Sequence, residues 1–322
     1  MIQVSTIGLD IAKRVFQVHG VDEVGRVVLR RQLRRAEVVT FFAKLAPCLV
    51  GLEACATAHY WGREIAALGH QVRLMPPTRV KAYVKWGKKN DTVDAQACCE
   101  AVIRPSMQFV PLKSVPEQAA LMTHRARQLL VEQRTRLANA VRGHMAELGI
   151  IARKGHAGFA ALVAMIECPE EAHLPGEVRP ILAVLVAQWR SLGPQIAALE
   201  QQIRAWHNSN PDSLRLATIP QFGPIVSSAL VATAGDAKRF RSGRQFAAWI
   251  GLVPAQNSTG GKQRLGGITK SGDRYLRQLL VIAATGLVHR ARANPEISPP
   301  AFAGAGSGSP GCSAECRRAK PP

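Results

Sequence analysis

The sequence lacks several features that would assign it to a familiar class of protein. No apolar run reaches the ~20 residues of a membrane-spanning helix, and Ile181–Ala187 is among the longest. The first residues, Met-Ile-Gln-Val, have neither the charged region nor the long apolar region of a signal peptide. The seven cysteines include no CxxC pair, which argues against a zinc site or a disulfide framework. We therefore expect a cytoplasmic protein with no membrane partner.

Acidic residues are scarce relative to basic ones. Lys and Arg number 42 against 22 Asp and Glu, which gives a formal net charge of +20 in 322 residues. Such an imbalance favours a polyanionic partner, because a protein of this charge otherwise repels itself. Nucleic acid is the first candidate and an anionic membrane surface the second. The length allows about two domains.

The first hundred residues predict an α/β domain in the order β-β-β-α-β-α-β-α. The expected strands are Val4–Leu9, Val15–His19, Val27–Leu33, Cys48–Leu52 and Gln71–Met75. The expected helices are Glu37–Leu45, Ala58–Leu68 (capped by Thr57) and a helix from Asp91 to Ala101. Three strands joined by short turns are typical of an antiparallel meander, and the alternating remainder indicates a mixed sheet flanked by helices.

The rest of the chain is predicted to be mostly helical. Apolar stripes predict long helices over 116–148 and 178–206, which we expect to pair as a coiled-coil hairpin. Shorter helices are expected over Arg244–Ile250 and from Asp273 to Arg290, with a polar, Gly-rich loop between Asn257 and Gly272. The resulting division is a domain at 1–112, a helical arm at 113–212, a C-terminal domain at 213–291 and a disordered tail at 292–322.

Four carboxylates stand out by their positions. Asp10 and Glu53 end the first and fourth strands, and Asp91 and Asp94 are spaced i,i+3 on one helix face. If the two strands are neighbours, all four side chains converge, and such a cluster needs cations between its members. Hard oxygen ligands suit Mg²⁺ or Mn²⁺, and a metal pair stabilises both oxygens of a phosphoryl displacement. Each carboxylate taken singly is more typical of a solvated surface than of a metal site.

Basic residues follow this set in the sequence. Arg79, Lys81, Lys85, Lys88 and Lys89 fall within eleven positions and alternate with Tyr83 and Trp86. Of these, Arg79, Lys85, Lys88 and Lys89 are predicted to hold a phosphodiester backbone beside the carboxylates. The alternative is a solvated helix face.

Two glycine-containing segments carry further candidates. The turn Ile219–Pro224, with Gly223, resembles a helix-hairpin-helix element whose backbone N–H groups bind phosphates. In the Gly-rich loop, a hydroxyl of Ser258 or Thr259 is placed to attack phosphorus and form a covalent intermediate. The cations expected to surround the phosphate are Lys262, Arg264, Lys270 and Arg274. A flexible loop of small residues is the alternative.

These segments together carry a resemblance to a known family. They are Ile7–Lys13, Gly51–Thr57, Lys89–Ala95, Ile219–Pro224, Gln245–Pro254, Asn257–Lys262 and Lys270–Arg277. Over residues 4–291 the chain resembles the DEDD-type transposases of bacterial insertion sequences, the insertion sequence one-hundred-ten family, which includes Piv-like recombinases.

The resemblance implies a RuvC-like, RNase H-fold domain whose metal-binding tetrad falls on Asp10, Glu53, Asp91 and Asp94. It also implies a nucleophilic serine in the C-terminal domain. The register of the motif places that serine on Thr259, whereas the less hindered hydroxyl belongs to Ser258, so both stay candidates. Family members are similar in forming homodimers or tetramers, and some use a structured guide RNA.

The expected function is therefore metal-dependent DNA strand cleavage and exchange in transposition, in the cytoplasm at the nucleoid. One alternative is a RuvC-like, structure-specific nuclease that uses water as its nucleophile and forms no covalent adduct. The other is a truncated, inactive relative that still binds nucleic acid.

Overall fold

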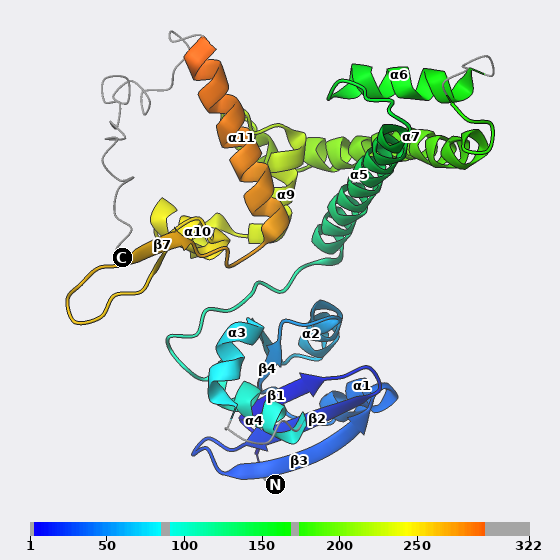
Figure 1. Ribbon diagram of the computed structural model, residues 1–322. Coiled ribbons are helices and arrows are strands. Elements are labelled where there is room, and N and C mark those ends of the chain that lie inside the picture. Colours follow the sequence, from blue (N-terminus) through cyan, green and yellow to red (C-terminus); the bar gives the residue numbers. More distant parts are fainter. Residues whose placement is uncertain (1–2, 85–90, 169–173, 294–322) are drawn as a thin grey trace, which may run out of the picture. The chain divides into compact units, whose positions relative to one another are not determined.

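The computed structural model describes residues 3–84, 91–168 and 174–293 (Figure 1). The chain divides into two compact units, residues 1–119 and 120–322, and each is described by itself. No helix among the described residues combines the length and the apolar character needed to cross a bilayer. The predicted α/β class with a mixed sheet is confirmed.

The first unit is built on a five-stranded sheet. Its strands are β1 (Thr6–Ile11), β2 (Val15–Val21), β3 (Val27–Arg34), β4 (Leu49–Glu53) and β5 (Gln71–Met75). Their spatial order is β3-β2-β1-β4-β5. The β3-β2-β1 part is an antiparallel meander, because short turns join these strands, whereas β4 and β5 are added parallel to β1 through helical crossovers.

Helices cover both faces of this sheet. On one face, α1 (Val38–Ala43) and α2 (Ala58–Ala67) close the main core with apolar side chains such as Ile7, Leu9 and Trp61. On the other face, α4 (Asp91–Val102) packs across β1, β2 and β4. Two short elements not predicted from the sequence, α3 (Pro77–Val80) and a 3-10 turn (Lys81–Tyr83), lie between β5 and the next gap in the described chain.

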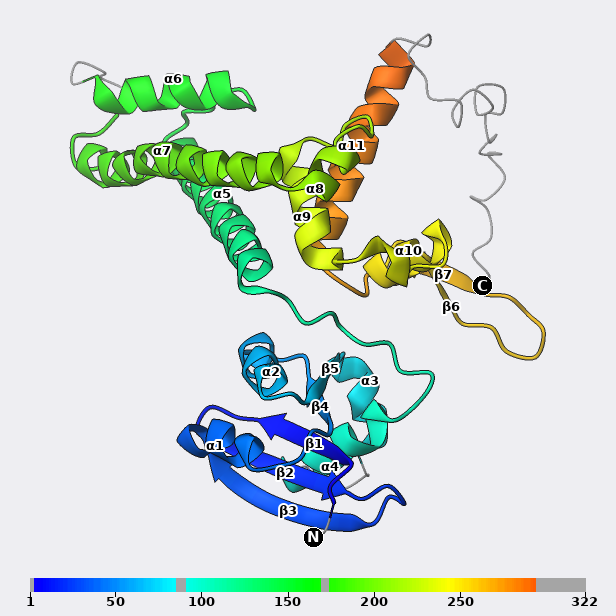
Figure 2. The same ribbon diagram turned by 180° about the vertical axis from the view of Figure 1, so that it is seen from behind.

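The second unit contains two long helices, α5 (Val115–Glu147, which begins in the first unit) and α7 (Arg179–Ser209). Between them the chain forms α6 (His156–Glu167), which the sequence analysis did not predict. α6 lies alongside one end of α7 in both ribbon views (Figures 1 and 2). A shared apolar cluster joins the three helices, with Met145, Leu162 and Leu182 at its centre. The arm is thus a packing of three helices.

A smaller group of elements follows α7. These are α8 (Pro211–Leu216), α9 (Pro224–Ala234), a 3-10 turn (Ala237–Arg239), α10 (Gly243–Ile250), β6 (Pro254–Gln256), β7 (Leu265–Ile268) and α11 (Arg274–Ala293). Ala229, Ile250 and Leu276 bring α9, α10 and α11 into one core. α9 also packs on α7, so the predicted arm and the predicted C-terminal segment lie in the same unit.

Three local expectations need correction. The segment 257–272 is not simply a loop, because β6 and β7 pair in antiparallel fashion and make it a hairpin. Thr57 does not cap α2 through its side chain, since its backbone is left-handed with φ +70°. Helix α11 continues through Arg292 and Ala293, which were assigned to the tail; the remainder of the tail lies outside the described residues.

Candidate metal centre

The register of β1 and β4 brings two carboxylates to the same edge of the sheet. The strands run parallel with Gly8 opposite Gly51 and Leu9 opposite Leu52. The next residue on each strand is Asp10 and Glu53, respectively. Because parallel strands end at the same edge of a sheet, both acidic side chains reach that edge.

Two glycines allow α4 to approach the sheet closely. A Cβ at Gly8 would stand 2.0 Å from the Ala95 carbonyl oxygen and 2.3 Å from the Cys99 nitrogen. A Cβ at Gly51 would stand 2.7 Å from the Cβ of Val102. Any larger residue would therefore push the helix off the sheet. This contact holds the first turn of α4, with Asp91 and Asp94, over the end of β1.

Three of the four predicted carboxylates converge. One oxygen from each of Asp10, Asp91 and Asp94 lies within 4.8 Å of the other two. Asp10 and Asp94 are half-buried, and Asp91 is exposed. Glu53 lies outside this tight group, but its charge still acts on Asp10.

The negative charges of the cluster repel one another, and burial together with this repulsion raises the pKa of Asp10. Burial, followed by the charges of Asp94, Asp91 and Glu53, raises the pKa of Asp10 from 3.8 to about 6. Burial and the same negative field raise the pKa of the neighbouring thiols Cys55 and Cys98 as well, so neither is a reactive thiolate. A cation between the carboxylates would relieve this repulsion.

The donor set fits a hard divalent cation. All the groups are carboxylate oxygens, they come from both a strand and a helix, and no Lys or Arg among the described residues forms an ion pair with Asp10, Asp91 or Asp94. Oxygen-only sites of this kind suit Mg²⁺ and Mn²⁺ and not Zn²⁺, which prefers nitrogen and sulfur.

Only the first part of the predicted basic run lies among the described residues. Arg79 lies in α3, is exposed, and donates from Nη2 to Gln108 Oε1 at 3.3 Å. Lys85, Lys88 and Lys89 lie outside the described residues.

The predicted hydroxyls lie at the tip of the β6–β7 hairpin. Residues Thr259 and Lys262 bracket a tight turn in which Lys262 N donates to Thr259 O at 3.1 Å. Gly260 and Gly261 have φ of +55° and +78°, a pair of positive values that two-residue hairpin turns require. Ser258 Oγ accepts a hydrogen bond from Gln256 Nε2 at 3.1 Å. Both hydroxyl-bearing residues are exposed, and the hairpin projects away from α10 (Figures 1 and 2).

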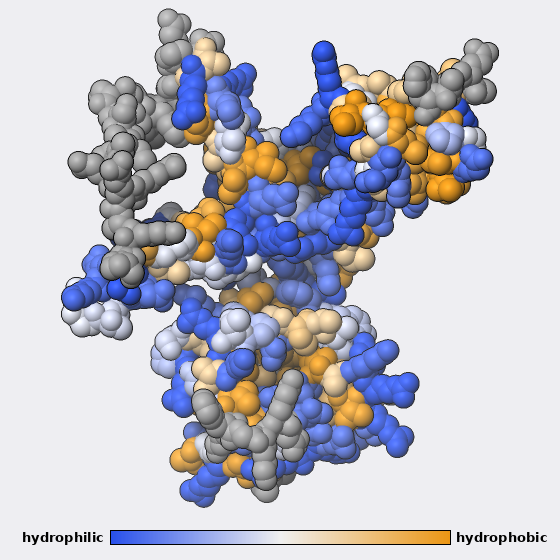
Figure 3. Space-filling model, in the orientation of Figure 1, coloured by the Kyte–Doolittle hydropathy of each residue, from blue (hydrophilic) through white to orange (hydrophobic). Residues whose placement is uncertain are grey.

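The basic side chains predicted around this turn are exposed to solvent, as the two hydroxyls are. Lys262, Arg264, Lys270 and Arg274 are all exposed. The tip of the hairpin is coloured in hydrophilic to neutral shades in Figure 3, whereas Leu265 and Ile268 of β7 are exposed apolar residues. Gly223 is the residue before α9 and has an extended backbone. Pro224, the first residue of α9, has no N–H group, so the first N–H groups of the helix belong to Ile225 and Val226.

Sequence reasoning missed the role of Gly8 and Gly51. The signal was present, because Gly8-Leu9-Asp10 and Gly51-Leu52-Glu53 repeat the same Gly-Leu-acid pattern at the ends of two strands. Each glycine precedes its carboxylate by two positions and therefore lies on the same face of the sheet.

Two family models match separate parts of the chain. A family model described as "Transposase", for DEDD transposases of IS110 elements, matches residues 7–150, and "Transposase IS116/IS110/IS902 family" matches residues 213–298. A probable family 20 transposase of Pseudomonas aeruginosa is 53% identical over 88% of this chain and 84% of its own length.

Two further relatives are named for particular insertion sequences. The transposase for IS1328 of Yersinia enterocolitica is 39% identical over 88% of this chain and 84% of its own length. The transposase for IS1111A of Coxiella burnetii is 36% identical over 91% of this chain and 80% of its own length. Identity at this level, over nearly the whole described chain, shows that the protein belongs to the IS110 family of insertion-sequence transposases.

Proposed function

We propose that this transposase cleaves and exchanges DNA strands by using Mg²⁺ or Mn²⁺ held by Asp10, Glu53, Asp91 and Asp94. The observation that carries the proposal is the convergence of Asp10, Asp91 and Asp94 within 4.8 Å on a strand and a helix that two glycines hold together. The mixed sheet with carboxylates at the ends of adjacent parallel strands supports an RNase H/RuvC-like assignment of the first domain.

Each carboxylate has a distinct role in this proposal. Asp10 is the central ligand, because it is half-buried and feels the charge of the other three. Asp91 and Asp94 complete the site from α4, and Glu53 contributes from the neighbouring strand. A bound divalent cation supplies charge neutralisation at the scissile phosphate and favours attack on it. Arg79, Lys85, Lys88 and Lys89 hold the DNA backbone nearby.

The attacking group is the hydroxyl of Ser258 or Thr259. Its oxygen forms a bond to phosphorus as one bridging P–O bond of the DNA breaks, and the departing oxygen takes the electron pair and a proton. Lys262, Arg264, Lys270 and Arg274 balance the charge of the phosphate. The N–H groups that follow Gly223 hold a second stretch of backbone.

The partners follow from charge and family. The net charge of +20 supports DNA as the substrate. A structured guide RNA, a homodimer or tetramer, and a location at the nucleoid in the cytoplasm rest on the family resemblance alone.

The experiment compares Asp10→Asn and Asp94→Asn with wild type on a plasmid that carries the element and its flanking DNA. Each variant is expected to lose at least about 100-fold in cleavage rate with Mg²⁺, while its affinity for the same DNA in EDTA stays unchanged. The control is Glu23→Gln, which removes one exposed charge in the turn between β2 and β3. That turn lies at the opposite edge of the sheet from Asp10. Wild-type cleavage by either tetrad variant would overturn the assignment.

A further inference from the structure

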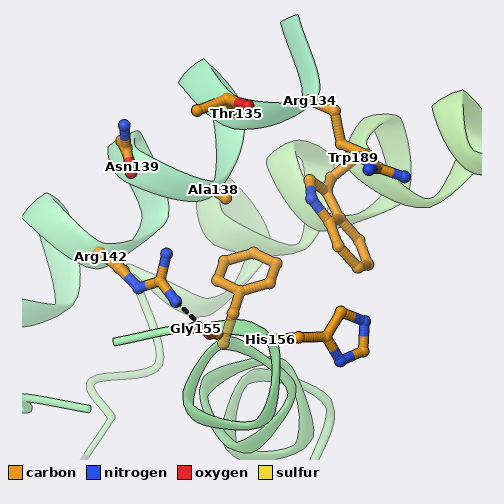
Figure 4. Close-up of a pocket in the computed structure, with 9 residues that line it drawn as sticks. Arg134, Thr135, Ala138, Asn139, Arg142, Gly155, His156 and Trp189 are labelled. Atoms are coloured by element: carbon orange, nitrogen blue, oxygen red, sulfur yellow. Dashed lines mark hydrogen bonds between the residues drawn. The ribbon is translucent and has the colours of Figure 1, made fainter. Parts of the chain in front are cut away.

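A small pocket lies in the helical arm, where α5, the start of α6 and α7 meet (Figure 4). Its cavity has a volume of about 190 Å³. The lining combines side chains of three chemical kinds: aromatic, cationic and neutral polar. None of the functions proposed above uses this pocket, and we call it the arm pocket.

The aromatic part is a fixed pair of rings. Phe159 is buried, and its ring centroid lies 4.8 Å from that of Trp189 with an interplanar angle of 58°. Phe159 is anchored in the core that α5, α6 and α7 share. Trp189 is only half-buried and also lines the cavity, so part of its indole ring remains available for a further flat partner.

The cationic part is arranged around this pair. Arg142 Nη2 donates to the Gly155 carbonyl at 2.7 Å, and the guanidinium lies 5.2 Å from the centroid of Phe159. These two contacts fix Arg142 at the wall of the pocket, as Figure 4 shows. Arg134, about two turns earlier on α5, also lines the cavity and forms no ion pair with any described residue.

Among the residues that the structure describes, no acidic side chain lines the pocket. The acidic residues of the adjoining helix surfaces are already paired elsewhere, since Glu132 approaches Arg136 and Glu167 pairs with Arg190. His156, at the first position of α6, adds an exposed imidazole, and the first N–H groups of that helix point toward the same end. The field in the pocket therefore favours an anion.

The neutral polar part consists of two side chains that line the pocket from α5, Thr135 and Asn139. Asn139 is exposed, and its amide offers both donors and an acceptor. Thr135 Oγ1 donates to the Val131 carbonyl at 2.9 Å, which leaves its lone pairs as acceptors. An aromatic face, hydrogen-bonding groups and a separate guanidinium are the three components with which proteins hold an unpaired nucleotide.

We propose that the arm pocket receives one unpaired nucleobase of a bound nucleic-acid strand, with the base stacked on Trp189 and its phosphate held by Arg134 and Arg142. The volume sets the limit of one base, because pockets for larger organic ligands start at about 300 Å³. The proposal shares with the proposed function the binding of nucleic acid, and it is independent of the carboxylates and their metal.

The test uses three short DNA duplexes of one sequence: fully paired, with a single unpaired adenine, and with an abasic residue at that unpaired position. Binding of the full chain is measured by fluorescence anisotropy in EDTA, which prevents metal-dependent cleavage. Wild type is expected to bind the adenine-bulged duplex with a Kd at least about fivefold lower than for the other two duplexes. Stacking of one base on an aromatic side chain changes the affinity by at least this factor. The abasic duplex separates recognition of the base from the flexibility of a bulge.

The variants assign the preference to the pocket. Trp189→Ala and Asn139→Ala are expected to lose the preference, whereas Trp189→Phe keeps part of it. Arg134→Ala is expected to weaken binding of all three duplexes and to flatten the salt dependence of log K by about 0.9. The control is Arg136→Ala, which removes an exposed arginine from the same helix outside the pocket and should retain the preference.

Equal binding of the three duplexes by wild type, or retention of the preference by both Trp189→Ala and Asn139→Ala, overturns the proposal. Thermal unfolding checks each variant, and Asn139→Ala carries the test if Trp189→Ala does not fold, because Asn139 is exposed. Adenosine monophosphate is added as a competitor. Full competition at concentrations near the duplex Kd would identify a free nucleotide as the ligand and overturn the strand assignment. Loss of cleavage in the tetrad variants has no bearing on any of these results.

Discussion

Gly8 lies directly against Ala95: a Cβ at position 8 would stand 2.0 Å from the Ala95 carbonyl oxygen. This contact between β1 and α4 places Asp91 and Asp94 beside Asp10, which lies two residues after Gly8 on the same strand. The carboxylate cluster therefore depends on a residue that has no side chain.

Gly8→Ala should separate the helix from the sheet. We expect a loss of about 1–3 kcal/mol in the free energy of unfolding, as for other overpacked sites, together with loss of metal-dependent cleavage. Urea unfolding and plasmid cleavage measure the two effects. The matched control is Gly143→Ala in α5, where an added Cβ meets nothing within 4 Å and should leave stability unchanged or raise it slightly. Wild-type stability in Gly8→Ala would contradict the close packing described above.

Asp10 should make the metal-free protein less stable as the pH rises. Its folded-state pKa is about 6, above the usual 3.8, so the folded state binds this proton more tightly than the unfolded state does. The stability that protonation contributes is complete below about pH 4 and is lost as the pH rises through 6. In EDTA at pH 7, Asp10→Asn should therefore be more stable than wild type by up to about 3 kcal/mol. At pH 4 the two proteins should differ little.

The same proton competes with the metal. Stabilisation of wild type by Mg²⁺ should be small below pH 6 and grow above it, because the carboxyl must lose its proton to act as a ligand. Thermal unfolding with and without Mg²⁺ across this range measures the effect. Stabilisation by Mg²⁺ that is as large at pH 4.5 as at pH 7.5 would argue against Asp10 as a ligand.

His124 should make the protein acid-sensitive. Its ring is 1% exposed, with Nδ1 at 3.1 Å from Tyr275 Oη and Nε2 at 3.0 Å from Ser228 Oγ. Burial, assisted by the charges of Arg127 and Arg125, lowers its pKa from 6.5 to about 4. The contribution of the neutral ring to the free energy of unfolding is complete above pH 6.5. It is lost as the pH falls toward 4, by up to about 3 kcal/mol.

Urea unfolding between pH 7 and pH 4 tests this expectation. His124→Leu is expected to lower stability at pH 7, because it removes the hydrogen bonds that the ring makes with Tyr275 and Ser228, but to reduce the further loss on acidification. His144→Gln, on the exposed side of the same helix, is the control and should keep the acid sensitivity of wild type. An unchanged pH slope in His124→Leu would show that another group titrates.

Ser258 and Thr259 should be separable by trapping the covalent adduct. A DNA substrate that releases its cleaved end is incubated with each alanine variant and Mg²⁺. If either hydroxyl attacks phosphorus, one substitution should remove the adduct and the other should only slow its formation, since the turn of Gly260 and Gly261 is retained in both. Full adduct yield in both variants would exclude the hairpin as the source of the nucleophile. Cleavage without any adduct in wild type would favour a nuclease that uses water.

Much of this protein could be predicted from the sequence because the relevant signals are local. Short apolar runs bounded by turns predict the five strands of the sheet, and the positions of Asp10 and Glu53 directly after two of these runs follow from them. The i,i+3 spacing of Asp91 and Asp94 fixes their common helix face. The sequence did not predict three features: helix α6, the β6–β7 pairing and the short helix α3. Short or strongly apolar segments have no distinctive period by which to recognise them.

The sequence by itself determined which residues carry carboxylate, hydroxyl and basic side chains, the order of most elements, and the family. The tertiary structure alone decided which of those residues meet. Parallel pairing of β1 with β4 and the clearance at Gly8 and Gly51 bring groups 81 to 84 positions apart into one cluster, while Glu53 stays at its margin. The arm pocket likewise exists only after α5, α6 and α7 pack. The physical reason is that side-chain chemistry is carried by each residue, whereas proximity depends on packing between segments that are distant in the chain.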